Sequence, residues 1–206
     1  MIFLGLFIFF IFLFAYLRKK SSAVQTNVEE EFWARENEAN RTRRQDISGL
    51  PYITIPFENF PMGIYDNSEI KACEETLTGL SEKKILNLGG QSNTDLKLKY
   101  GPANLETLTE CDDNYALLCR TVVSYAQTLL SLGHKEEAKT VLESGVACGL
   151  DHSLNYLLLA DLYLETGDTA AFQALIAQAE SLDSPQRDSI VRRLREKESA
   201  EHTSLD

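Results

Sequence analysis

Apolar side chains recur at steps of three and four residues along the second half of the chain, which is the period of one helical face. Gly133, Gly149 and Gly167 interrupt this pattern at points where helices would end. The pattern predicts helices from Asp112 or Asp113 to Gly133, from Lys135 to Gly149, from Asp151 to Gly167 and from Asp168 to about Ala179, and a last helix that begins at Ser184-Pro185.

The first half is patterned differently. Prolines 51, 56 and 61 surround the apolar run Tyr52–Phe57, and proline favours an extended segment because it fixes φ and lacks a donor. This Pro-rich arm (residues 50–62) is too apolar for a free linker, so we expect it to pack along a helical domain. A helix is predicted over 66–81, capped by Asn67 or Ser68. The alternation over 96–100 predicts a short strand or an irregular loop.

Residues 1–17 are apolar without a break and are followed by Arg18-Lys19-Lys20. We interpret this run as a transmembrane helix, because a cleaved signal peptide, the alternative, carries its basic residues before the apolar run. The position of the basic triplet predicts a single-pass protein of the cell membrane, with its N-terminus outside and its C-terminal domain cytoplasmic. The lipid bilayer would then be one partner of the chain.

A charged juxtamembrane connector follows over residues 18–49. Its acidic triplet Glu29–Glu31 precedes Phe32 and Trp33, the only tryptophan of the chain. Trp33 either packs on the domain or a helix edge, or lies at lipid headgroups, and the neighbouring acids disfavour an anionic membrane surface. The expected fold is therefore mainly α: a transmembrane helix (1–17), this connector (18–49), and a small α-helical domain with the Pro-rich arm (50–206).

The helical half repeats itself at a step of 34 residues. Ala126 recurs as Ala160, Gly133 as Gly167, Leu142 as Ile176 and Gly145 as Ala179. Over residues 119–185 the chain resembles tetratricopeptide repeat proteins, which stack helical pairs with small residues at close helix contacts. It departs from that pattern at Phe172, where a small residue is expected. An ordinary helical hairpin bundle with a coincidental step is the alternative.

The resemblance implies two repeats and a capping helix, with the first helix of each repeat lining a groove for a protein or peptide. Carried over to this chain, the groove positions are Arg120, Val123, Gln127, Leu130, Leu154, Leu157, Asp161 and Leu164. Asp161 and Glu165 at the edge would suit an amphipathic segment with basic residues. The groove could equally be filled by the chain's own Pro-rich arm.

Charge and composition argue against some classes of partner and cofactor. The formal net charge is −11, and the segment from Cys111 to Asp183 contains eleven acidic and three basic residues. This acidic excess argues against nucleic acid as a partner, because phosphates bind basic surfaces. The four cysteines show no spacing of metal ligands or a redox pair, so we expect neither a metal nor another cofactor.

Three hypotheses follow. No histidine has a candidate nucleophile near it in the sequence. Gly89-Gly90 is not a phosphate-binding loop, because it lacks the other residues that such loops need. We therefore expect no enzyme activity, and an enzyme with dispersed catalytic residues is the weakest hypothesis. A membrane-anchored adaptor or scaffold that binds proteins through the repeats comes first, and a structural subunit of a larger membrane complex second.

Overall fold

The computed structural model describes residues 7, 14 and 28–204 of the chain. Over these residues the protein is mainly α-helical, as expected, and no strand is found among them. The described chain forms two units. Unit 1 contains residues 28–47 and Ser92–Leu105, and unit 2 contains Ser48–Gln91 and the chain from Glu106 onward.

The expected fold class needs one correction. No helix in the described part of the chain is both long and apolar enough to cross a membrane. The run 1–17 had been interpreted as a transmembrane helix, but apart from Phe7 and Phe14 it lies outside the described residues. The transmembrane helix is therefore withdrawn from the fold class.

Unit 1 pairs a helix over residues 28–41 with α3 (Asn93–Tyr100) and the short 3₁₀ helix η2 (Pro102–Asn104). The prediction of a strand or loop over 96–100 is wrong. Ser92 caps α3: its side chain accepts a hydrogen bond from the Asp95 amide, and the Asp95 carboxylate accepts one from the Ser92 amide. This reciprocal cap favours a helix over the strand that the alternating leucines suggested.

Buried Asn104 holds unit 1 together beyond α3. Its amide nitrogen donates to the carbonyls of Gln45 (2.8 Å) and Tyr100 (2.7 Å), and its side-chain oxygen accepts from Arg44 Nε at 3.1 Å. The backbone also passes very close to Gly101, where a Cβ would come within 2.7 Å of the Arg43 carbonyl oxygen. The segment after helix 28–41 is thus fixed to the end of α3 by polar contacts.

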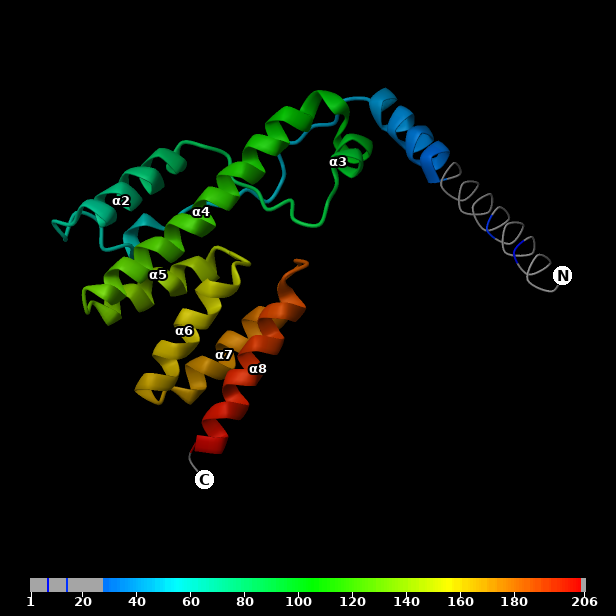
Figure 1. Cartoon of the computed structure of the whole chain (residues 1–206). Coiled ribbons are helices and arrows are strands. Elements are labelled where there is room, and N and C mark those ends of the chain that lie inside the picture. The colour runs from blue at the N-terminus through cyan, green and yellow to red at the C-terminus, as the bar shows by residue number, and fades with distance from the viewer. Residues whose placement is uncertain (1–6, 8–13, 15–27, 205–206) are drawn as a thin grey trace. The chain divides into compact units, whose positions relative to one another are not determined.

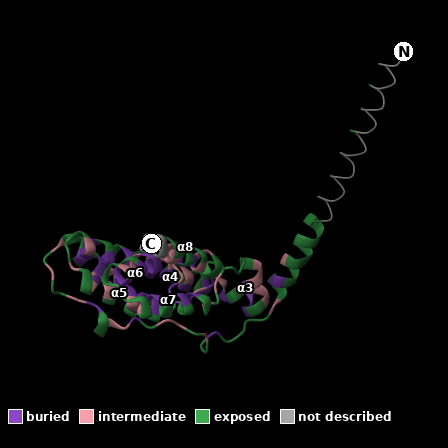
Figure 2. Cartoon of the chain, turned by 90° about the horizontal axis from the view of Figure 1, so that it is seen from below, coloured by how far each residue is buried: buried purple, intermediate pink, exposed green. Residues whose placement is uncertain are grey.

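Unit 2 is a stack of helices. These are α2 (Ser68–Ser81), α4 (Leu105–Ser131), α5 (Lys135–Ala147), α6 (Ser153–Thr166), α7 (Thr169–Glu180) and α8 (Arg187–Ser204). Figure 1 shows α6, α7 and α8 side by side, and α5 packs on α6 in turn. The buried hydrophobic residues of these helices belong to one hydrophobic cluster, and they are coloured purple in Figure 2. This packing is compatible with a helical repeat.

Local sequence signals explain several helix ends in unit 2. Asn67 caps α2 by accepting from the amides of Glu69 (2.8 Å) and Ile70 (3.1 Å), and Asp168 caps α7 by accepting from Ala171 at 3.0 Å. Gly167 closes α6 in the left-handed conformation at φ 69°, which glycine adopts at little cost. The start of α4 at Leu105 is earlier than expected, because Asp112 lies inside the helix and accepts a hydrogen bond from the Leu88 amide instead of capping it.

The Pro-rich arm runs without regular structure except for the 3₁₀ helix η1 (Phe57–Asn59). Ile55 and Phe60 are buried in the core of unit 2, and the ring of Phe60 stacks on Tyr125 of α4 with centroids 6.4 Å apart. The Tyr125 hydroxyl donates to the Pro61 carbonyl at 3.0 Å. Each such buried apolar side chain contributes about 1.5–3 kcal/mol, so the arm is part of the folded unit.

Candidate functional site

The predicted groove positions lie on α4 and α6 and differ in exposure. Val123 and Leu157 are buried, and Leu157 belongs to the main core of the unit. Leu130, Leu154 and Leu164 are half-buried, whereas Arg120, Gln127 and Asp161 are exposed. The exposed polar residues therefore alternate along these two helices with apolar residues that are buried or half-buried.

The acidic edge of this groove carries its own counter-ions. The Asp161 carboxylate pairs with the ammonium of Lys197 from α8, and Glu165 pairs with Lys135 from α5. A basic ligand would therefore have to displace these lysines. The electrostatic attraction expected from the sequence is correspondingly reduced, because the two ammonium groups neutralise these carboxylates.

The structure places Arg120 beside a surface cleft of about 700 Å³. The cleft is bounded by the middle of α4, the turn before α6, the turn before α8 and the loop at Gly89-Gly90. Its lining residues are Asn87, Gly89, Gly90, Asp112, Tyr115, Ala116, Cys119, Arg120, Asp151, His152, Ser153, Pro185 and Gln186. None of the other predicted groove residues lines it. The cleft is thus a feature that the sequence did not indicate.

Asp151 is the centre of the cleft wall. Its Oδ1 accepts from the Tyr115 hydroxyl at 2.6 Å, and its backbone amide donates back to the same hydroxyl at 2.9 Å. Its Oδ2 accepts from the Asn87 amide at 3.2 Å and from the Ser184 hydroxyl. Asp151 was expected to cap α6, but the cap position is His152, and Asp151 instead joins three other segments.

Burial controls the chemistry of the two groups beneath the cleft. The pKa of Tyr115 is raised, chiefly by burial and further by Cys119 and the Asp151 carboxylate. Burial raises the pKa of the Cys119 thiol to about 12, so this cysteine is a neutral packing residue and a poor nucleophile. The Nδ1 atom of His152 is buried and has no hydrogen-bond partner among the described residues.

Gly90 lies in the cleft wall for a packing reason. It adopts φ 83°, and a Cβ there would come within 2.7 Å of the Pro185 ring. The close contact with Pro185 accounts for a glycine at this position without any phosphate. Among the described residues, no group of three histidine, cysteine or acidic side chains could hold a metal ion.

The lining of the cleft includes the guanidinium of Arg120, the side-chain amides of Asn87 and Gln186, and the hydroxyls of Tyr115 and Ser153. Comparison of the chain with protein-family models, with curated proteins and with solved structures gives no match.

Proposed function

We propose that unit 2 is a tetratricopeptide-like interaction module that binds a protein or peptide through the exposed face of α4 and α6. Within the repeat, Ala126, Ala160 and Ala179 are fully buried, as small residues at close helix contacts should be. Gly145 packs so closely on α6 that a Cβ would lie 2.7 Å from Asn155 Oδ1. Phe172, the departure from the pattern, is buried in the core.

The observation that supports an external partner is the position of the Pro-rich arm. The arm packs on the side of α4 that carries Tyr125. Successive residues of an α-helix are about 100° apart, so Val123 and Gln127 point about 200° away from Tyr125. The arm therefore occupies the side of α4 opposite to the predicted groove, which disfavours a groove filled by the chain itself.

The test uses substitutions in the exposed groove and a matched control. Arg120→Glu together with Gln127→Glu reverses the polarity of the α4 face, whereas Gln178→Glu changes an exposed glutamine of α7. Proteins that copurify with the native chain should be lost from the double variant and retained by the control. Partners in variable, exchangeable amounts indicate an adaptor, and one partner in fixed stoichiometry indicates a structural subunit. Retention of every partner by the double variant would contradict the proposal.

A further inference from the structure

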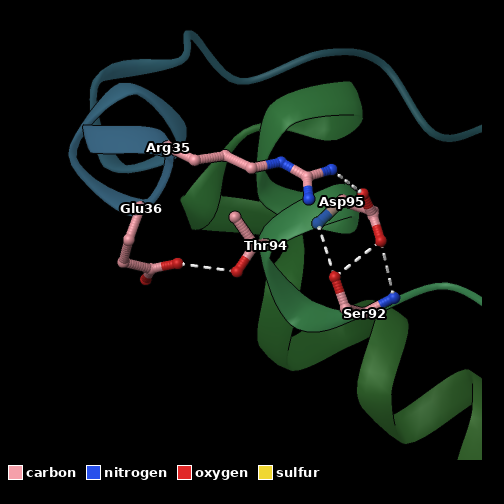
Figure 3. Close-up of polar contacts among 5 residues, drawn as sticks. All are labelled: Arg35, Glu36, Ser92, Thr94 and Asp95. Atoms are coloured by element: carbon pink, nitrogen blue, oxygen red, sulfur yellow. Dashed lines mark hydrogen bonds and ion pairs between the residues drawn. The ribbon is translucent and has the colours of Figure 1, made fainter. Parts of the chain in front are cut away.

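Helix 28–41 in unit 1 is covered by α3 along only part of one face. Val28, Phe32, Arg35, Glu36 and Ala39 fall on one side of the helix by their three- and four-residue spacing. Figure 3 shows the covered part, where Arg35 reaches Asp95 (2.5 Å) and Glu36 accepts from Thr94 at 2.8 Å. Glu36 also pairs with Lys97, and Ala39 is fully buried.

Toward residue 28, the same side of the helix is exposed. Val28 is 60% exposed, Phe32 53% and the adjacent Trp33 60%. The two rings contact each other edge to face, with centroids 5.3 Å apart. Two exposed aromatic rings beside an aliphatic side chain form an apolar patch of the kind that marks interaction sites.

Three consecutive glutamates flank the patch. Glu29, Glu30 and Glu31 are exposed, and within the described part of the chain none of them forms an ion pair. They differ in this from Asp161 and Glu165, which are neutralised by lysines. We call Val28, Glu29–Glu31, Phe32 and Trp33 the acidic–aromatic surface.

We propose that the acidic–aromatic surface docks a basic polypeptide segment with an apolar face. The aromatic rings would be covered by the apolar side of such a segment, and its Lys and Arg residues would pair with the three glutamates. A second copy of the chain fits poorly, because two acidic patches would face each other, and an anionic lipid surface is repelled for the same reason. The inference is independent of the groove in unit 2.

Trp33 allows a direct test because it is the only tryptophan. The full chain is titrated with a synthetic 18-residue Leu/Lys peptide of helical amphipathic pattern, and the Trp33 emission is recorded. We expect a saturable shift of the emission to shorter wavelength, with affinity that falls when the salt is raised to about 0.5 M. A Leu/Glu peptide of the same pattern should give no shift.

Two variants separate charge from apolar contact. The triple substitution E29Q/E30Q/E31Q should weaken binding about tenfold, the loss expected for three exposed charge pairs. The control E75Q/E82Q/E106Q removes the same charge from exposed sites in unit 2 and should leave the affinity unchanged. Phe32→Ser should also weaken binding, while the helical circular dichroism signal of the chain is retained.

Several results would overturn the proposal. These are the absence of any Trp33 shift with the Leu/Lys peptide, an equal shift with the Leu/Glu peptide, and an equal loss of affinity in the control variant. A shift that follows protein concentration without peptide would assign the surface to a second copy. A shift with phosphatidylglycerol vesicles but none with the peptide would assign it to lipid.

Discussion

Tyr115 and Asp151 exchange two hydrogen bonds across 36 residues of sequence, one from the tyrosine hydroxyl to the carboxylate and one from the Asp151 amide to that hydroxyl. The pair ties α4 to the turn before α6. Asn87 and Ser184 bond to the second carboxylate oxygen, so the loop before α3 and the turn before α8 depend on the same side chain. Asp151 therefore connects three segments of unit 2 through hydrogen bonds.

Tyr115→Phe should lower the free energy of unfolding by about 1–3 kcal/mol, because it removes both hydrogen bonds between the buried tyrosine hydroxyl and the half-buried Asp151. Chemical denaturation measures this loss. A double-mutant cycle with Asp151→Ala, which removes the accepting oxygen, should give a coupling energy well above experimental error. Additive losses in the two single variants would show that the contact contributes nothing to stability.

Gly145→Ala should destabilise unit 2 by about 1–3 kcal/mol, since the new methyl group meets Asn155 Oδ1 at 2.7 Å and Val122 Cγ1 at 3.1 Å. Gly79→Ala in α2 is the matched control. No atom lies within 4 Å of its Cβ position, so it should stabilise the helix by about 0.5–1 kcal/mol. Thermal unfolding of both variants compares the two effects, and equal shifts would contradict close packing between α5 and α6.

Phe60→Ala should cost about 3–5 kcal/mol, because the ring is buried in the core and stacks on Tyr125. Ile64→Ala changes a side chain that is 65% exposed and should stay within about 0.5 kcal/mol. Urea denaturation measures both free energies. A small loss for Phe60→Ala would mean that the arm is only a tether.

The contacts of Glu36 and Asp95 predict loss of unit 1 packing in acid. Hydrogen bonds from Lys97 and Thr94 lower the pKa of Glu36, and hydrogen bonds from Ser92, with the nearby Arg35, lower that of Asp95. A lowered folded-state pKa means that the stabilisation is complete above the unfolded values of about 4 and disappears as the pH falls through the folded values.

Amide hydrogen exchange along residues 36–41 should therefore accelerate, relative to α7, as the pH is lowered from about 6 to about 3 after correction for intrinsic rates. Glu36→Gln should show much of this loss already at pH 6. Glu38→Gln, at an exposed position on the same helix, should behave like the native chain. Unchanged protection in Glu36→Gln would contradict a role of this carboxylate in holding the helix on α3.

Local signals in the sequence explain why much of unit 2 was predictable. Asn67 and Asp168 cap helices and Gly167 ends one, as inferred from residue type and position alone. Ser92 and Asp95 have the three-residue spacing of a reciprocal helix cap, which is a signal present in the sequence. The alternation of Leu96 and Leu98 favoured a strand instead, so this cap was not predicted.

The cleft was not predictable in this way. Its central contacts join Asp151 to Asn87, Tyr115 and Ser184, which are 64, 36 and 33 residues away. A single sequence carries no local signature of such pairs, and Asp151 before an apolar run has the pattern of a helix cap. The ion pairs of Asp161 and Glu165 could not be predicted either, because their lysines are also distant in the sequence.

Site-specific photocrosslinking tests the central claim, a polypeptide bound on the exposed face of α4 and α6, most directly. A benzophenone amino acid replaces Gln127 on α4 or, as the control, Gln178 on α7, in cells that produce the chain. Both side chains are exposed on helices, so nonspecific crosslinking to passing proteins should be similar at the two positions. A polypeptide bound on this face should give discrete crosslinked partners from position 127 and none of these from position 178. Crosslinks from position 178 alone, or from neither position, would contradict this claim.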